Sequence, residues 1–475
     1  MSSSMDVLRK FAKFVGPGIM VSVAYMDPGN YSTSVSGGAQ YKYKLLFSIF
    51  ISNLFAIVLQ CLCVKLGTVT GYDLAENCRR NLPRKINLTL YFFAELAIIA
   101  TDLAEVVGTA IALQILFGIP LTWGVILTVL DVLVILLFYK PEEQSMKRVR
   151  LFELFVGTLV IATCFCFLLE LFKINIPHKK TLFEGFLPSK VIFEDKQALY
   201  ISLGILGATV MPHSLYLGSS LVKPRLQEHD MKKYGKVEAR PSLSAIKYSL
   251  NYAYAELIIS LFLIATFVNS AILIVAGASL FGQPDAADAD LLSIYELLVH
   301  YISPAAGLIF ALAMLCSGQS AGIICTMAGQ IVSEGFLEWS LPPWATRLCT
   351  RLIAIIPCLF VTLTMGERGI SDILNLSQVV LSLILPIVSA PLIYFTACRK
   401  LMTVPDVYGE NNGTLENNDA VIDEHTPLTL ERKKLEADFT NSRWLTWLAV
   451  LIWATIGGLN CYLVGSFLMG ADVHF

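Results

Sequence analysis

Two long apolar stretches of this chain are each interrupted near the middle by a proline that lies among polar residues. The first interruption is Asp27-Pro28-Gly29-Asn30, within 11–38, and the second is Met211-Pro212-His213, within 197–222. Proline removes a backbone donor and glycine permits unusual dihedral angles, so both stretches are predicted to form broken helices. Unwound backbone is tolerated inside a membrane only where protein buries it or where it lines a watery cavity. Two such breaks in matching halves of a chain indicate a transporter's binding site near the membrane midplane.

The composition is that of a membrane protein. Hydrophobic residues make up 55% of the chain and charged residues 15%, which is too few charges for a soluble globular domain. We therefore predict an all-α polytopic membrane protein, and a net charge of −2 gives no indication of nucleic-acid binding. The eleven predicted transmembrane helices are 11–38, 45–66, 87–117, 120–139, 150–172, 197–222, 249–276, 303–332, 345–365, 371–397 and 444–469.

The distribution of basic residues predicts the orientation of these spans. If the N-terminus is cytosolic, the C-terminus lies on the opposite, lumenal side. That side then holds only eight of the 35 basic residues, namely Lys42, Lys44, Lys173, Lys179, Lys180, Lys190, Lys196 and Arg368. The eleven cysteines lie in or beside the spans, apart from Cys78 in a cytosolic loop, and are expected to pack as small apolar residues.

The spans are predicted to form two repeats and an addition. Residues 1–400 form the transporter core, in which 11–172 and 197–397 are repeats of five helices that each begin with a broken helix. An odd number of spans per repeat places the second repeat upside-down relative to the first. The polar segment 401–443 is predicted to be a flexible cytosolic linker, and 444–475 holds the eleventh helix and the lumenal C-terminus.

The polar groups at the breaks are candidate metal ligands. An intramembrane carboxylate such as Asp27 is costly without a partner, which favours a function, although an Asp at a kink can also be a helix cap. Asn30 adds an amide, and the backbone carbonyls of Ala24 and Ala208 are expected to be unpaired near the breaks. Met211 is either a packing residue or a thioether ligand, which would favour later transition metals over Mg²⁺ or Ca²⁺.

A second polar group lies on the predicted helix 87–117. Glu95, Asp102 and Glu105 are spaced by seven and three residues, which places them near one face. Acidic groups within a span mark ion or proton pathways, and His213 also titrates near neutral pH.

Three further polar residues lie in the last part of the core. Arg347 and Arg351 are candidate counter-charges for a proton pathway, and Arg347 can equally be an anchor at the membrane edge. Gln378 can supply an oxygen ligand or hydrogen-bond a neighbouring helix, and the residues alone favour the latter.

These motifs resemble the Nramp family of proton-coupled divalent-metal transporters, and the resemblance covers nearly the whole chain. The matching motifs are Asp27-Pro28-Gly29-Asn30, Ala100-Thr101-Asp102-Leu103-Ala104-Glu105-Val106-Val107-Gly108, Met211-Pro212-His213, Ser317-Gly318-Gln319-Ser320, Ala328-Gly329-Gln330, Glu334-Gly335-Phe336-Leu337 and Ser377-Gln378-Val379-Val380.

The resemblance implies a LeuT-type fold in which divalent metal ions and protons are the substrates. It implies no enzymatic activity and no bound cofactor, and it requires no oligomer. The metal ligands that it implies are Asp27, Asn30, Met211, the carbonyls of Ala24 and Ala208, and Gln378. The proton-pathway residues that it implies are Asp102, Glu105 and His213, with Arg347 and Arg351 beyond them; Glu95 joins this set as the remaining acid of the same helix.

One position departs from the family pattern. Many members have a second histidine five residues after the one in Met-Pro-His, and this chain has Gly218 there, which calls a route through that histidine into question. Within the family, the motifs are most similar to fungal members, especially the vacuolar-membrane branch that returns stored iron to the cytosol.

We therefore expect a secondary active transporter that moves Fe²⁺, Mn²⁺ or both with protons from the vacuolar lumen into the cytosol. The alternative locations are endosomal and plasma membranes. The alternative functions are an organic-solute transporter and a non-transporting metal sensor on the same fold. Asp27 argues against an anionic solute, and the segment 401–443 is small for a signalling domain.

Overall fold

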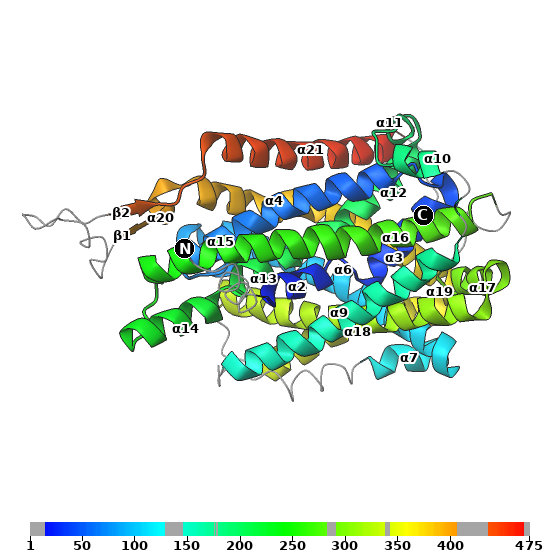
Figure 1. The fold of residues 1–475 in the computed structure, drawn as a ribbon, viewed down its shortest axis with the longest axis horizontal. Helices are drawn as coiled ribbons and strands as arrows, with labels where there is room; N and C mark the ends of the chain where they lie inside the picture. The colour runs from blue at the N-terminus through cyan, green and yellow to red at the C-terminus, as the bar shows by residue number, and fades with distance from the viewer. Residues whose placement is uncertain are drawn as a thin grey trace, which may run out of the picture.

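The structure, a computed structural model, describes residues 15–128, 146–174, 176, 179–282, 291–337, 343–405 and 436–469. Long helices run side by side along one direction (Figure 1). Eight of the described helices are long and apolar enough to cross a membrane: Leu46–Thr70, Arg84–Phe117, Met146–Lys173, Lys196–Tyr234, Leu243–Ser279, Pro304–Leu337, Ile373–Ala397 and Arg443–Leu468.

Both predicted breaks are present. The first divides α2 (Pro17–Val23) from α3 (Pro28–Tyr41), and the second divides α12 (Lys196–Thr209) from α13 (Pro212–Ser220). In α3 and α13 a proline occupies the first helical position, where its fixed φ suits the helix and its missing N–H costs no bond within that helix. The all-α architecture with broken first and sixth spans is confirmed, whereas the described residues do not confirm the number eleven.

The remaining helices carry the bundle and its connections. The membrane-crossing ones are α4 (Leu46–Thr70), α6 (Arg84–Phe117), α9 (Met146–Lys173), α15 (Leu243–Ile259), the π-helix η1 (Ser260–Ala265), α16 (Thr266–Ser279), α18 (Pro304–Leu337), α19 (Pro343–Ala397) and α21 (Arg443–Leu468). The shorter ones are α5 (Leu74–Asn81), α7 (Leu121–Leu127), α10 (Lys179–Glu184), α11 (Val191–Glu194), α14 (Lys223–Tyr234), α17 (Leu291–Tyr301) and α20 (Arg399–Met402).

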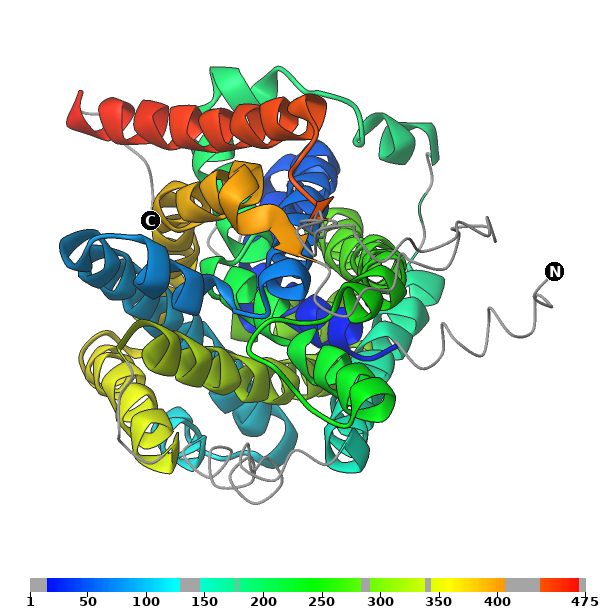
Figure 2. The ribbon, with the colours of Figure 1, turned by 90° about the vertical axis from the view of Figure 1, so that its left-hand side faces the viewer.

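The connection between two predicted spans differs from the prediction. The segments 345–365 and 371–397 are joined by helical backbone as parts of α19, because residues 366–369, which were expected to be a loop, are helical. Glu and Arg favour helix nearly as well as apolar residues do. Figure 2 shows the yellow first part and the gold last part of α19 in different places across the bundle, and α19 accordingly contacts both α7 and α21.

Other differences concern the connections. The predicted span 120–139 is described only as far as residue 128, where it forms α7, and its remainder lies outside the described residues, as do 11–14 of the first span. At the two ends of the segment 401–443, β1 (Thr403–Pro405) pairs antiparallel with β2 (Glu436–Asp438), and 406–435 lie outside the described residues. Neither these strands nor α17 were predicted.

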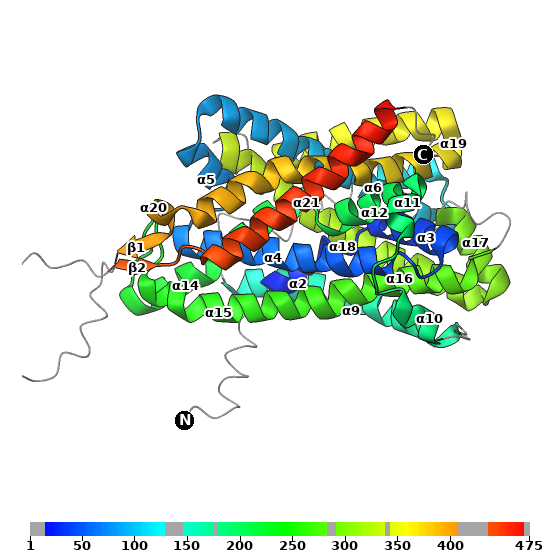
Figure 3. The ribbon, with the colours of Figure 1, turned by 90° about the horizontal axis from the view of Figure 1, so that it is seen from above.

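The two ends of the bundle carry different connections. The strands β1 and β2 and helix α14 lie at one end, and α10, α11 and α17 lie at the other (Figure 1). This is the division that the predicted cytosolic and lumenal loops require. Helix α21 lies at the edge of the bundle, against α19 (Figure 3).

The outer surface of the bundle is apolar, while polar groups are buried inside it. Phe92 is 61% exposed and Trp447 71% exposed, yet Asp27 and Gln60 are completely buried. This reverses the arrangement in a soluble protein and fits a surface solvated by lipid. Inside the bundle, the ring of Tyr31 packs edge-on against Phe167 and Phe310, with ring centroids 5.3 and 6.0 Å apart, and joins α3 to α9 and α18.

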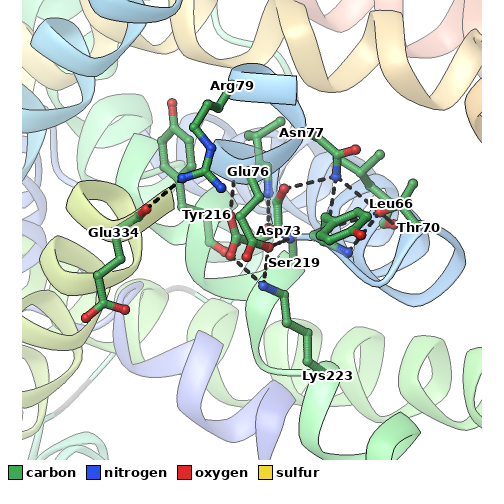
Figure 4. A network of polar contacts seen from close by, with 12 residues as sticks. Leu66, Thr70, Asp73, Glu76, Asn77, Arg79, Tyr216, Ser219, Lys223 and Glu334 are labelled. Carbon is green, nitrogen blue, oxygen red and sulfur yellow. Dashed lines mark hydrogen bonds and ion pairs between the residues drawn. The ribbon is translucent and has the colours of Figure 1, made fainter. Parts of the chain in front are cut away.

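A charged network joins the start of α14, which follows α13, to α5 (Figure 4). Asp73 and Glu76 form a capping box at the start of α5, in which Asp73 Oδ1 accepts from the Glu76 N–H at 2.9 Å. Lys223, the first residue of α14, lies 2.6 Å from Asp73 Oδ2 and also pairs with Glu76. The Leu74 N–H donates to Ser219 Oγ of α13 at 2.9 Å. The helix that leaves the second break is thereby tied to the connection between α4 and α6.

The two carboxylates of this network respond differently to their surroundings. Burial raises the pKa of Asp73 to about 6, although the Lys223 ammonium acts in the other direction. Burial also opposes ionisation of Glu76, but the Lys223 charge outweighs it and lowers the pKa of that carboxyl. Because the folded state holds the Asp73 proton more tightly than the unfolded chain, this carboxyl favours folding below about pH 4. That contribution is lost as the pH rises through about 6.

We expect Lys223→Met to lower the melting temperature more at pH 7 than at pH 5. At pH 7 both carboxylates lose the ammonium that pairs with them, whereas at pH 5 Asp73 is largely protonated. Removing one partner from a partly buried pair typically costs about 1–3 kcal/mol. The control is Lys232→Met, since Lys232 pairs with Glu228 and its side chain is 73% exposed. Equal losses at both pH values would contradict the interpretation of this network.

Candidate metal-binding site

The two breaks free one backbone carbonyl each, and for the same reason. Pro28 lies four residues after Ala24, and Pro212 lies four residues after Ala208. In a helix these carbonyls would accept from the N–H groups at the proline positions, and proline has none. The predicted carbonyl ligands thus follow from the position of one proline in each break.

The two carboxylate oxygens of Asp27 differ: one caps a helix and the other has no hydrogen-bond partner among the described residues. It is the N-cap of α3, where Oδ1 accepts from the Asn30 backbone N–H at 3.0 Å and from Asn30 Nδ2 at 2.7 Å. Oδ2 is buried and has no hydrogen-bond partner among the described residues. The two interpretations of Asp27 as a helix cap and as a functional carboxylate are therefore compatible, because each concerns a different oxygen.

Asn30 joins the first break to the second. Its Nδ2 lies 2.7 Å from Asp27 Oδ1 and 2.8 Å from the Ala208 carbonyl oxygen, so one N–H₂ group bridges the two negative groups. On the other side of the breaks, the Tyr25 hydroxyl lies 3.4 Å from Ser214 Oγ. Residues about 180 positions apart in the chain are in this way brought to one place.

Met211 and Gln378 are buried beside the breaks. Met211 is the N-cap of α13, and its carbonyl accepts from the Ser214 N–H at 3.1 Å and from Ser214 Oγ at 2.7 Å. The carboxamide of Gln378 packs on the first turn of α3, because a Cβ added to Gly29 would lie 2.2 Å from Gln378 Nε2. Gln378 Oε1 has no hydrogen-bond partner among the described residues. It is a second buried oxygen that lacks a partner in this region.

Three residues that support the breaks were not singled out from the sequence. Asn269 Nδ2 of α16 donates to the Tyr25 carbonyl at 2.9 Å, and Ser317 Oγ of α18 donates to the Met26 carbonyl. Gln60 Nε2 of α4 donates to the Tyr25 hydroxyl at 3.0 Å. Asn269 and Gln60 could have been identified from the sequence, because each places an amide side chain in an apolar span. Ser317 lies in a family motif to which no role had been given.

The acidic residues of α6 divide into two groups. Asp102 and Glu105 are buried together with Arg351 of α19, which pairs with Asp102 and lies 3.7 Å from Glu105 Oε2. The Cys325 sulfur lies within 4.8 Å of ligand atoms of both acids, so these three side chains could in principle hold a cation. The guanidinium already supplies a positive charge to both acids there, which favours an ion-pair network over a second metal site. Glu95 lies apart from them and accepts from Ser333 Oγ at 3.3 Å.

His213 is connected to α6 beside this cluster. It is buried in α13, and its Nδ1 lies 3.3 Å from Thr101 Oγ, the neighbour of Asp102. The predicted proton-pathway residues Asp102, Glu105, Arg351 and His213 therefore lie on adjoining elements. The side chain of Arg347 is outside the described part of the structure.

Gly218 has a structural explanation. A Cβ added at this position would lie 2.2 Å from Gln60 Oε1, and Gln60 is held by bonds to Tyr25 and, at 2.8 Å, to Ser214 Oγ. The space beside Gly218 is filled by Gln60, so an imidazole at 218 would require Gln60 to move.

The fold and these buried polar groups define an integral membrane protein of the LeuT-type fold, with its candidate site at two facing helix breaks. A family model described as "Nramp: Natural resistance-associated macrophage protein-like" matches residues 18–406. The chain belongs to the Nramp family.

Individual proteins agree with this assignment. The chain is 79% identical over 475 residues to "Iron transporter SMF3" of Saccharomyces cerevisiae, with 100% of both chains covered. It is similar to the crystal structure of the Eremococcus coleocola manganese transporter, with a TM-score of 0.78, 30% identity, and 99% and 91% of the two chains covered. Mhp1, a nucleobase-cation-symport-1 family transporter, shares the fold alone, with a TM-score of 0.56, 12% identity, and 80% and 78% covered.

We expect Gly108→Ala to destabilise the first break. A Cβ on Gly108 of α6 would lie 2.1 Å from the Cβ of Pro28, and a proline ring has no rotamer by which to withdraw. Overpacking of this kind typically costs about 1–3 kcal/mol. The matched control is Gly457→Ala in α21, where an added Cβ meets nothing within 4 Å and alanine should, if anything, favour the helix. Melting temperatures of the two purified variants test this, and equal values would show that α6 does not press on Pro28.

Proposed function

We propose that this protein is a secondary active transporter that moves Fe²⁺, Mn²⁺ or both with protons. The observation that carries the proposal is the unpartnered, buried Asp27 Oδ2 at the first break, whose other oxygen Asn30 links to the Ala208 carbonyl of the second break. A buried carboxylate oxygen without a partner is costly, and a bound cation is the kind of group that compensates it. The names of an iron transporter and of a manganese transporter among its relatives support a divalent transition metal as the cargo.

In this proposal the ligands are Asp27, Asn30, Met211, the carbonyls of Ala24 and Ala208, and Gln378. The Asn30 N–H₂ group lies between Asp27 and the Ala208 carbonyl, where its partial positive charge stands in for a cation. Binding of a metal ion would rotate this amide so that its oxygen, and not its nitrogen, faces the ion. The Met211 thioether would add affinity for the softer transition metals relative to Ca²⁺ and Mg²⁺.

Protons are proposed to move through the cluster beside the metal site. Asp102 and Glu105 share one guanidinium, that of Arg351, so the three side chains together carry an excess negative charge unless one acid is protonated. His213 is proposed to connect this cluster to the second break through Thr101. Glu95 and Arg347 are proposed to lie further along the route.

The direction of transport is proposed from the predicted topology. Inverted repeats of 11–172 and 197–397 would rock about the breaks to expose the site alternately to each side. A vacuolar membrane suits this protein because an acidic lumen would drive protons, and metal with them, into the cytosol. Each pH unit of gradient contributes about 1.4 kcal/mol per proton.

We expect Asp27→Ala to abolish metal uptake, because the ion loses the one anionic ligand at the breaks. Purified protein in proteoliposomes would be assayed for Mn²⁺ and Fe²⁺ uptake with and without an inward proton gradient. Asp27→Asn keeps a side chain that can cap α3 and separates loss of charge from loss of folding. Glu184→Gln, on the exposed helix α10, is the carboxylate control. Uptake by either Asp27 variant at the unsubstituted protein's rate would refute the site assignment.

We expect Met211→Ala to retain Mn²⁺ uptake while Ca²⁺ becomes a better competitor. Removal of the thioether leaves oxygen ligands only, and oxygen ligands suit hard cations. The measurement is the Ca²⁺ concentration that halves Mn²⁺ uptake, compared with that for Met231→Ala, a methionine exposed on α14. An unchanged value would show that the thioether does not contribute to selectivity.

A further inference from the structure

A cavity of about 660 Å³ lies between α14 and the first turns of α9 and α15. Its volume is within the range of about 300–1,000 Å³ that small-molecule sites occupy. Its charged lining consists of five cations and one carboxylate: Lys147, Arg150, Arg225, Lys232, Lys233 and Glu228. These elements lie at the end of the bundle where β1 and β2 also lie, the predicted cytosolic end (Figure 1).

Part of this positive charge is not neutralised by the residues that the structure describes. Arg225 is paired with Glu153 at 2.9 Å, and Lys232 is paired with Glu228 at 2.5 Å. Lys147 and Arg150 are exposed and form no ion pair with any described residue. The surplus of cations repels Fe²⁺ or Mn²⁺, so this cavity is unsuited to the metal pathway and suited to an anion.

The position of the cavity relates it to the membrane surface. Immediately after Arg150, the outward face of α9 becomes apolar, with Leu151, Leu154 and Phe155 exposed by 62%, 67% and 48%. Such side chains face lipid in a membrane-crossing helix. Tyr248 of α15 lines the cavity and packs against His229, with ring centroids 5.0 Å apart, and tyrosine is enriched at membrane interfaces. The cations therefore lie where the phosphates of lipid headgroups lie.

We propose that this cavity binds the phosphorylated headgroup of an anionic lipid of the cytosolic leaflet. Basic pockets between transmembrane helices on this side are known to take multiply charged headgroups. Lys147 and Arg150 supply unpaired charge to the phosphates, and the apolar face of α9 beyond them accommodates the acyl chains. This proposal does not depend on the proposed metal transport, because it involves none of the residues at the breaks.

The site is connected to the start of α2 through Arg225. Arg225 holds the Glu153 carboxylate and also donates to the Val15 carbonyl at 3.4 Å, just before α2 begins. Glu256 of α15 accepts from the N–H groups of Gly16 and Gly18 at 2.9 Å, so the same region anchors the start of α2. Because Arg225 is part of this anchor, a test of binding must leave it in place.

The test is binding of short-chain phosphatidylinositol bisphosphate to the purified full-length protein, measured by native mass spectrometry. The variant is Lys147→Gln with Arg150→Gln, two exposed residues whose loss should leave the melting temperature unchanged. The matched control is Arg84→Gln with Lys85→Gln, which removes one Arg and one Lys from the exposed first turn of α6. We expect binding to weaken about tenfold or more in the first variant and to remain in the control.

Two further probes identify the source of the phosphate. Short-chain phosphatidylcholine should bind far more weakly than the bisphosphate lipid, and so should inositol trisphosphate, which has the phosphates without the acyl chains. Equal losses in both double variants, or a loss in neither, would overturn the proposed site. Inositol trisphosphate binding as tightly as the lipid would overturn the lipid and indicate a soluble phosphate ligand. If the double variant does not fold, Lys147→Gln alone carries the same comparison against Lys85→Gln.

Discussion

The structure depends on Pro28 and Pro212, two buried prolines that have no backbone N–H to donate. At each proline one half-helix ends, the carbonyl four residues earlier loses its helical donor, and a second half-helix begins with Asp27 or Met211 as its N-cap. Inside a membrane no water compensates the other unpaired groups, so neighbouring helices must do so. Asn269 bonds the Tyr25 carbonyl and Ser317 the Met26 carbonyl, while the Ala208 carbonyl accepts from Asn30 of the other break. Helices α16 and α18 are therefore as much a part of the site's construction as the broken helices themselves.

The buried acids form two neighbouring groups that differ in whether a basic side chain pairs with them. Asp102 and Glu105 have the permanent cation of Arg351, and a buried pair of this kind repays its desolvation only with close geometry. Asp27 has no permanent cation and relies on the amide of Asn30 and on the N-terminus of α3. A group that keeps its counter-charge can exchange protons without losing its structure. A group that lacks one is suited to a cation that comes and goes.

The sequence was most informative where a local rule decides the structure. A proline inside an apolar run predicted both breaks. Asp27 was recognised as a candidate because a carboxylate inside a membrane is costly without a partner. Contacts between distant segments were out of reach: nothing local links Asn30 to Ala208, or Gln60 to the space beside Gly218. The helical backbone of residues 366–369 was missed because two glycines and two charged residues between apolar stretches are typical of a loop. The strands β1 and β2 were missed because each is only three residues long and is stabilised by the other.

The two oxygens of Asp27 have different contacts, which explains how a cation could leave such a site without unfolding the start of α3. If a single oxygen both capped α3 and held a cation, departure of the cation would also alter the helix start. Here Oδ1 keeps its bonds to Asn30 while Oδ2 remains available. The side chain of Asn30 can withdraw from the Ala208 carbonyl, and its backbone N–H still fastens the cap. The start of α3 therefore keeps its backbone cap whichever group the Asn30 side chain contacts.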